Sequence, residues 1–478
     1  MMMEKRDINI VRTIVLLALS IICVFSCSNK EGYELIFLYP FTLVIVLTFT
    51  HIDRLAKKYI GIKILYVTIL IKYALLPFCL CFANNLTGVG IEPESHALQI
   101  ASILQSLELI VVSIVVWYFG KTKLDSRHMM QTFSLREEKT NIRQSYFIEI
   151  VLIIIALFFI LIHPDLLRNF SFLQYDESTF TVSYFRGMDI RIIQIALMVF
   201  FCTIVSVCRK KYIQSGSSVY YIISLIIGVF SMLVIKGENR ASLLINIIAV
   251  YIVLVAAFPQ KRKNISITIF AFGVVALVLL SLYRMLAVTA WRPQGGTLDF
   301  SFDGAVRLIQ AYLSGPRNVA QGIGATHAYS TSFNTFISDI FVWSGYIGNS
   351  IASIFDIEYL STSLLFNRFI YGNSALSSGD QIVPLCVQSL WYLGYLGSLL
   401  FSALVARLVV KFDELICKSD TLPMIYINTI MAVVTGLMLG YNVTIISMYF
   451  MDRYLIFLVF IAIARWWNKH IRVYQSCN

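Results

Sequence analysis

Four arginines stand at the edges of apolar segments, in patterns that suit the binding of an anion. Arginine presents a planar, permanently charged fork that grips phosphate or carboxylate oxygens in pairs. A lipid diphosphate is one ligand of this kind. We therefore interpret these residues as candidate diphosphate ligands: Arg186, Arg191, Arg240 and Arg317. For each of them, an ion pair with a neighbouring carboxylate or a contact with lipid headgroups is the structural alternative.

The local sequence supports the choice of these positions. Arg240 ends the short turn KGENR, where the following apolar segment begins and a helix dipole would also favour anions. Arg317 follows a Gly-Pro pair, which predicts a backbone turn at the start of a helix. Arg186 and Arg191 flank Asp189 just before another apolar segment.

Asp380 is a candidate general base that would take a proton from a sugar hydroxyl. The polar stretch around it, SSGDQ, could instead cap the helix that follows. Asp452 and Arg453 lie inside the last apolar segment, where charges are costly and often functional. A structural pair with Lys72 or Glu108 is the alternative for these two.

No known catalytic or cofactor motif accompanies these residues. HExxH, GxSxG and Walker patterns are absent. Cys79 and Cys81 have no matching second pair, so we predict no metal and no cofactor, and interpret the cysteines within apolar runs as packing residues.

The composition indicates a polytopic membrane protein. The 478 residues are 58% hydrophobic and 14% charged, with a mean hydropathy of +0.77. A soluble protein has roughly 25% charged residues and about 45–50% apolar residues, and a disordered chain has fewer apolar residues than that. We attribute the net charge of +11 to basic cytoplasmic loops. The sequence has no basic stripe with interleaved aromatics, so it does not predict nucleic-acid binding.

We predict an all-α fold with about twelve transmembrane helices, because a helix of ~20 apolar residues spans the hydrocarbon core. We interpret the first apolar segment as a retained span. The segment that contains Pro40 is short, and the last two segments could form either one hairpin or two full spans. The twelve segments are 10–28, 35–51, 64–83, 97–120, 146–164, 192–208, 218–236, 241–259, 266–289, 383–410, 424–443 and 445–465.

The basic residues predict the topology. With the N-terminus in the cytoplasm, 24 Lys and Arg fall on the inner side, 10 on the outer side and four inside spans. This bias favours an N-in, C-in chain with a single membrane domain. Residues 1–289 would form spans one to nine, 290–382 a large outer loop, and 383–478 spans ten to twelve with a cytoplasmic tail. Within the aromatic-rich loop, 304–313 predicts a helix and 333–355 an interfacial or re-entrant helix.

Three stretches resemble the Wzy-type polymerases of bacterial surface polysaccharides. Residues 233–244 are similar to the family's Gly-x-x-Arg-Ala turn between two spans. Residues 312–324 and 373–411 resemble the start of the large loop and the end of that loop with its Gly-punctuated helix. The related O-antigen ligases often carry a histidine near the end of this loop, where this sequence has Ser377, Ser378, Gly379 and Asp380.

The resemblance implies an enzyme of the bacterial inner membrane. Its substrate would be an oligosaccharide on undecaprenyl diphosphate in the outer leaflet, surrounded by membrane lipid. The enzyme would transfer the growing chain from one lipid diphosphate to a sugar hydroxyl of the next unit. A base would take the proton of that hydroxyl, with Asp380 as the first candidate and Asp189 and Glu238 after it. A flippase and a chain-length regulator would be its partners. O-antigen ligase, a flippase or other transporter, an acidic-pair glycosyltransferase and a membrane scaffold are the alternatives.

Overall fold

The computed structural model describes residues 2–86, 90–124, 147–164, 184–233, 240–291, 301–341, 353–354, 360–372 and 381–476. The side chains of 2–9, 147–148, 184–190, 240, 283–291, 465 and 468–476 are excluded from the description. Within these ranges the chain is helical and contains no strand, as the sequence predicts.

The first half of the chain contains eleven of the described α-helices and two other helical segments. They are α1 (Met2–Cys27), α2 (Leu38–Thr50), α3 (Ile52–Ala56), α4 (Ile60–Leu70), the π-helical η1 (Ile71–Leu75), α5 (Leu76–Phe82), α6 (Ser95–Lys123), α8 (Phe147–Ile162), α9 (Tyr184–Ser215), α10 (Ser218–Leu233), α11 (Arg240–Ala257), the 3₁₀ turn η4 (Pro259–Lys261) and α12 (Arg262–Trp291).

The second half begins with four helices inside the predicted outer loop: α13 (Phe302–Tyr312), α14 (Pro316–Ala328), α15 (Phe333–Phe341) and α17 (Thr362–Tyr371). It continues with α18 (Leu385–Gly397), α19 (Leu400–Lys418), α20 (Leu422–Gly436), α21 (Val443–Tyr449), the π-helical η6 (Phe450–Leu455) and α22 (Ile456–Ser476). The helix predicted over 304–313 is α13. Of 333–355, the described residues form α15 and a short helical piece at 353–354.

Each of the twelve predicted apolar segments contains described helix, although residues 437–442 of the segment 424–443 form a turn. Six described helices are long and apolar enough to cross a membrane, and the bent pair α18–α19 would make a seventh. Five further apolar helices are shorter: Leu38–Thr50, Glu149–Ile162, Ser218–Leu233, Ala241–Ala257 and Leu422–Gly436. The chain is thus a helical protein with several membrane-spanning candidates, and the count of twelve spans stays a prediction.

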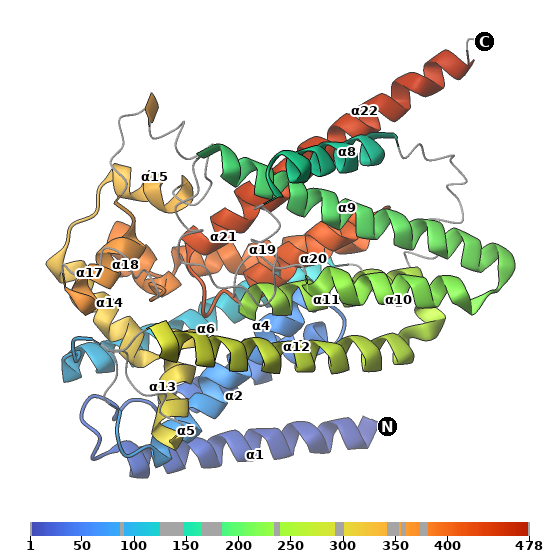
Figure 1. Cartoon of the computed structure of the whole chain (residues 1–478). Coiled ribbons are helices and arrows are strands. Elements are labelled where there is room, and N and C mark those ends of the chain that lie inside the picture. The colour runs from blue at the N-terminus through green and yellow to red at the C-terminus, as the bar shows by residue number, and fades with distance from the viewer. Residues whose placement is uncertain are drawn as a thin grey trace.

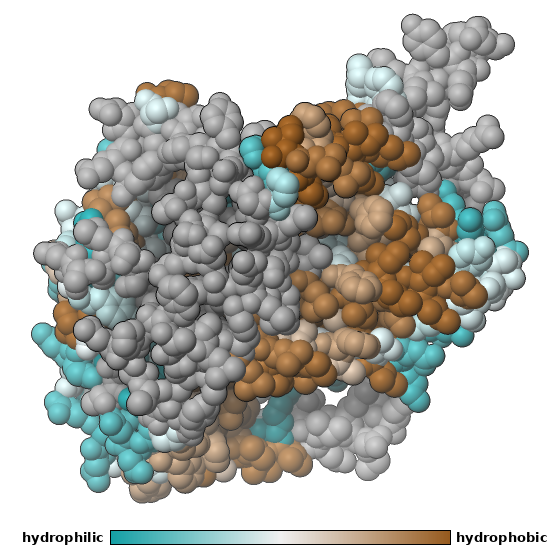
Figure 2. Space-filling model, in the orientation of Figure 1, coloured by the Kyte–Doolittle hydropathy of each residue, from teal (hydrophilic) through white to brown (hydrophobic). Residues whose placement is uncertain are grey.

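The surface and the chain ends are arranged as a membrane bundle requires. Figure 2 shows apolar side chains gathered over the middle of the bundle, with hydrophilic ones toward its two ends. In Figure 1, α1 begins and α22 ends toward the same end of the bundle, whereas α14, α15 and α17 lie at the opposite end.

One predicted span is broken. The segment 383–410 was expected to be one continuous helix, but α18 and α19 meet at an angle of 115°. Gly394 has left-handed backbone angles (φ 65°), which interrupt the helix. The Ser389 hydroxyl donates to the carbonyl of Gly397 at 2.6 Å and accepts from the amide of Phe401 at 3.4 Å. A side chain thus satisfies backbone groups that the break leaves open, which is the condition for a broken helix in an apolar bundle.

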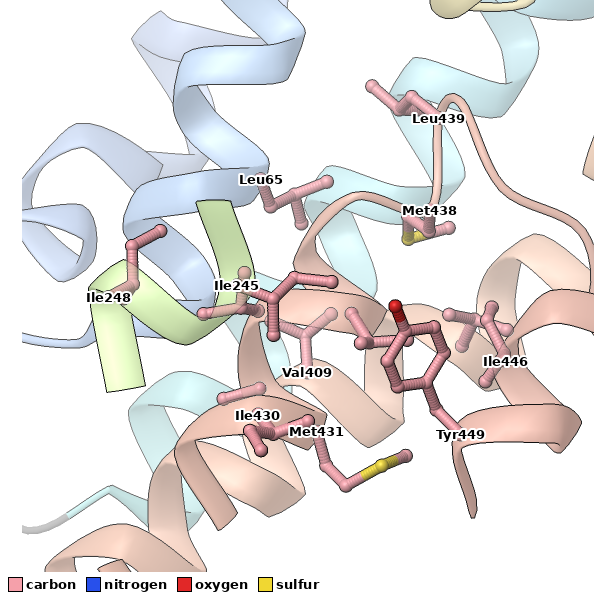
Figure 3. Close-up of a cluster of buried hydrophobic side chains, with 14 of the residues drawn as sticks. Leu65, Ile245, Ile248, Val409, Ile430, Met431, Met438, Leu439, Ile446 and Tyr449 are labelled. Atoms are coloured by element: carbon pink, nitrogen blue, oxygen red, sulfur yellow. The ribbon is translucent and has the colours of Figure 1, made fainter. Parts of the chain in front are cut away.

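The turn between α20 and α21, residues 437–442, lies where the loop helices meet the bundle. A Cβ on Gly440 would stand 2.3 Å from the carbonyl oxygen of Tyr312, so the turn and the end of α13 are in backbone contact. Beneath the turn, Figure 3 shows a buried cluster of side chains from α4, α11, α19, α20, α21 and the turn itself: Leu65, Ile245, Ile248, Val409, Ile430, Met431, Met438, Leu439, Ile446 and Tyr449.

This close approach predicts the effect of adding a methyl group. Gly440→Ala should destabilise the protein by about 1–3 kcal/mol, because the new Cβ meets the backbone of Tyr312, which cannot move aside cheaply. Gly273→Ala is the matched control, since its nearest neighbour is the Cδ1 of Ile247 at 3.0 Å, the flexible end of a side chain. Thermal unfolding in detergent gives the melting temperature of both variants. Equal melting temperatures for the two would contradict the contact.

Candidate functional site

Arg317 occupies the start of α14, as predicted. Gly315 is the N-cap and Pro316 the first helical residue. The turn before them is tight, with Ser314 at φ 48° and the amide of Gly315 donating to the carbonyl of Gln310 at 2.7 Å. The fixed φ of proline suits the first turn of a helix, which places Arg317 at a defined point on the bundle.

The guanidinium of Arg317 is buried and holds a carboxylate. It binds Glu92 through both terminal nitrogens, with Nη2 donating to Oε1 at 2.9 Å, and Nη1 also donates to the carbonyl of Leu86 at 3.2 Å. The Arg317 side chain is 6% exposed, whereas that of Glu92 is 54% exposed. The cation is therefore fixed, while the anion it holds lies at the surface.

Further polar groups surround Arg317. Ser314 Oγ and Asn318 Nδ2 are buried and have no hydrogen-bond partner within the described part of the chain. Gln105 Nε2 donates to the carbonyl of Ser314 at 2.5 Å. Burial raises the pKa of Tyr33 to about 12, while the positive charge of Arg317 acts in the opposite direction. A buried polar region thus lies between α6, the α13–α14 turn and the α1–α2 connection.

Arg191 belongs to a second charged cluster. Its Nη2 lies 2.7 Å from Oδ2 of Asp452, and both side chains are mostly buried. The neighbouring Arg453 places its guanidinium 4.8 Å from the ring centroid of Tyr449, and its charge also acts on Arg191. The cluster therefore brings two cations and one carboxylate together. The sequence-based alternative of a pair between Asp452 and Lys72 is wrong, because Asp452 forms its ion pair with Arg191, whereas Lys72 lies beside Glu108.

The start of α11 approaches the same cluster. The hydroxyls of Ser242 and Tyr449 are 2.9 Å apart, which joins the first turn of α11 to α21. Arg240 is the first residue of α11, as expected for a turn that ends there. Its backbone thus lies two residues from Ser242, although its side chain lies outside the described residues.

The remaining predicted site residues are described either by their backbone alone or not at all. Arg186 and Asp189 lie in the first turns of α9, upstream of Arg191, with side chains outside the description. Glu238 and Asp380 fall wholly outside the described residues. The structure therefore brings Arg191 and the start of α11 to one cluster, places Arg317 in a separate ion pair, and leaves the choice of base untested.

Two π-helical segments carry charged residues within apolar helices. Asp452 and Arg453 are on η6, and Lys72 is on η1. Lys72 Nζ lies 3.8 Å from Glu108 Oε2, with the two side chains 1% and 2% exposed, and donates to the carbonyl of Leu439 at 3.4 Å. The Ser402 hydroxyl donates to the other oxygen of Glu108 at 2.6 Å. Single π turns inside α-helices are frequent at functional sites.

Sequence reasoning missed Asp339, a buried carboxylate on α15 that joins four helices. Its Oδ2 accepts from the Thr362 hydroxyl (2.6 Å), the Gln388 amide (2.6 Å) and the Tyr392 hydroxyl (2.8 Å). Its Oδ1 accepts from the Thr362 amide (2.9 Å) and the Thr444 hydroxyl (3.3 Å). The donors come from α17, α18 and α21. The only sequence signal was a lone acid in the apolar stretch FISDIF.

Neutral donors surround Asp339, so burial dominates its ionisation. Desolvation raises the pKa of this carboxyl above its ordinary value of 3.8, and the hydrogen bonds from Thr362, Tyr392 and Gln388 only partly oppose that rise. Both of its oxygens accept hydrogen bonds, and no cation among the described residues acts on it, so Asp339 positions helices rather than offering a base to a substrate.

No metal-ligand cluster is present in the part of the chain that the structure describes, since it places no three His, Cys, Asp or Glu side chains to hold an ion. No protein-family model matches the chain, and neither the curated proteins nor the solved structures compared with it provide a match.

Truncation of Asp339 should destabilise the loop helices. Asp339→Ala removes the acceptor of five hydrogen bonds, which come from Thr362, Gln388, Tyr392 and Thr444, at a cost of about 3 kcal/mol. Glu94→Gln is the control, because Glu94 is exposed at the start of α6 and makes no side-chain cap. Limited proteolysis and thermal unfolding in detergent compare the two. An Asp339→Ala protein as stable as the control would contradict the role.

The raised pKa of Asp339 also predicts a pH dependence. A carboxyl with a raised folded pKa contributes stability that is fully present below 3.8 and is lost as pH rises through the folded value. The melting temperature should therefore contain a component that falls with rising pH above about 4. Asp339→Asn cannot titrate and should lack that component. Parallel melting curves against pH for the two proteins would contradict it.

Proposed function

We propose that this chain polymerises lipid-linked oligosaccharide repeat units at the outer face of the bacterial inner membrane. The observation that carries the proposal is the convergence of Arg191 and Arg453 with the first turn of α11, which begins at Arg240. Two cations balanced by one carboxylate leave a net positive site for a lipid diphosphate. The resemblance of 233–244, 312–324 and 373–411 to Wzy-type polymerases supplies the reaction.

The reaction needs few protein groups. The donor carries its own leaving group, a diphosphate, which arginines can neutralise as the glycosidic bond to the lipid breaks. A base takes the proton of the acceptor hydroxyl as the new bond forms, and Asp380, Asp189 and Glu238 remain the candidates. The unpartnered Ser314 and Asn318 groups beside Arg317 are suited to sugar hydroxyls. Undecaprenyl diphosphate is the released product.

The proposed topology has twelve spans with both termini in the cytoplasm. It is supported by the six described helices that are long and apolar enough to cross a membrane, by the five shorter apolar helices, and by the placement of the chain ends opposite the loop helices (Figure 1). The ion pair between Arg12 and Asp53 joins two segments assigned to the inner side. Asn84 and Asn85, assigned to the outer side, donate backbone amides to Asp303 of the loop at 3.1 and 3.0 Å.

A transporter is the second candidate, and a specific feature favours it. Discontinuous helices and buried intramembrane charges are common in transporters, and the chain has the α18–α19 break and the Lys72–Glu108 pair.

A gel of surface polysaccharide from a strain lacking the chain separates the candidates. A polymerase defect leaves single repeat units without a ladder, whereas a flippase or ligase defect removes the single-unit band too. An unchanged ladder contradicts the polymerase, flippase and ligase functions.

The arginine assignments predict the behaviour of variants in the same assay. Arg240→Ala and Arg317→Ala should abolish the ladder while the protein level in the membrane stays normal, because each loses a proposed diphosphate contact. Arg368→Ala is the control from another loop helix, α17. Full-length polymer from both Arg240→Ala and Arg317→Ala would show that the site is misassigned.

Glu92→Gln separates the two roles that Arg317 could have. If Arg317 serves only to hold Glu92, then Glu92→Gln should damage polymer formation as much as Arg317→Ala. If Arg317 binds the ligand, Glu92→Gln removes a competing carboxylate and the ladder should persist.

A further inference from the structure

Three cysteine thiols meet at one end of the bundle. Cys81, near the end of α5, donates its thiol proton to Cys23 with the sulfurs 3.4 Å apart. Cys27 donates to Cys81 across 3.9 Å. Cys23 and Cys27 are four residues apart on α1, so they lie on the same helical face and both reach Cys81. All three are buried and free.

The surroundings of Cys81 favour thiol chemistry. Lys30, three residues after α1 ends, directs its ammonium group at the carbonyls of Leu80, Cys81 and Ala83, at 2.6, 2.9 and 2.7 Å. A positive charge is therefore held at the end of the helix that carries Cys81. A neighbouring cation stabilises the thiolate, which is the form of cysteine that reacts.

We propose that Cys81 forms a disulfide with either Cys23 or Cys27, and that the bond passes between them by thiol–disulfide exchange. Formation removes two protons and two electrons from the Cys81 thiol and one thiol of α1. A protein or small-molecule disulfide of the compartment accepts them and becomes a dithiol. In the exchange, the thiolate of the free cysteine attacks Cys81, and the released cysteine takes up the proton.

The supply of oxidant rests on the proposed topology. Cys23, Cys27 and Cys81 stand at the ends of α1 and α5 that we assign to the outer side, and disulfides persist outside the bacterial cytoplasm. The bond would tie α1 to α5. The third thiol remains reduced beside it, so this tie can be re-formed at a second position on α1 without another oxidant.

Peptide mapping of the full chain tests the proposal. Membranes are quenched in acid, and free thiols are blocked with a maleimide before digestion without reductant. Cleavage at Lys and Arg leaves Cys23 and Cys27 on peptide 13–30, and Cys79 and Cys81 on peptide 73–121. We expect these two peptides to be linked in the native protein and in Cys23→Ser, Cys27→Ser and Cys79→Ser. The link should be lost in Cys81→Ser and in the Cys23→Ser/Cys27→Ser double variant.

Cys79 is the matched control because it lies two residues from Cys81 on the same helix, whereas the sulfur contacts join Cys81 to Cys23 and Cys27. A link that survives in Cys81→Ser, or one that is lost in either α1 single variant, would overturn the shared disulfide. Free thiols after treatment of membranes with a thiol oxidant would overturn it as well. A link that forms only after added oxidant supports the disulfide site and contradicts the outer placement. The polysaccharide ladder is scored separately, so failure of the polymerase proposal leaves this result standing.

Discussion

The fold depends on satisfying polar groups inside an apolar bundle, and Asp339 is the clearest case. Its carboxylate gathers donors from Thr362, Gln388, Tyr392 and Thr444, which belong to α17, α18 and α21. Outside water, each of these donors would be costly without an acceptor, so one carboxylate holds three other helices in register. The loop helices are therefore bound to the bundle by directional contacts as well as by apolar packing.

The same rule governs the charges of the candidate site. Arg191 is neutralised by Asp452 and Arg317 by Glu92, so the protein supplies carboxylates where a diphosphate is proposed to bind. These internal anions keep the cations in place before a ligand arrives. A ligand must compete with them, and the exposed Glu92 is more easily displaced than the mostly buried Asp452. Arg453, stacked on Tyr449, adds the charge that Asp452 does not balance.

The sequence alone determined which parts of the chain are helical and apolar. The apolar runs predicted helices, and every run contains described helix, because hydrophobicity over ~20 residues is a local property. The count of twelve spans stays a prediction, since six of the described helices are long and apolar enough to cross a membrane. Local signals also placed Arg317 at a helix start, through the Gly-Pro pair, and α13 within the loop. The break at Gly394 was not predicted, since a glycine in an apolar run does not by itself indicate a residue with positive φ.

The tertiary structure decided the partners of the charges. Arg191 and Asp452 are separated by 261 positions, and Glu92 and Arg317 by 225, so no local pattern could pair them. In the sequence, Asp339 looks like an ordinary acid in an amphipathic helix. Its role follows only from the donors that α18 and α21 bring to it. The three thiols likewise read as packing residues, because their contact depends on how α1 lies against α5. Sequence fixes segment type through local free energies, whereas long-range pairing follows from which buried groups the packed helices bring within reach.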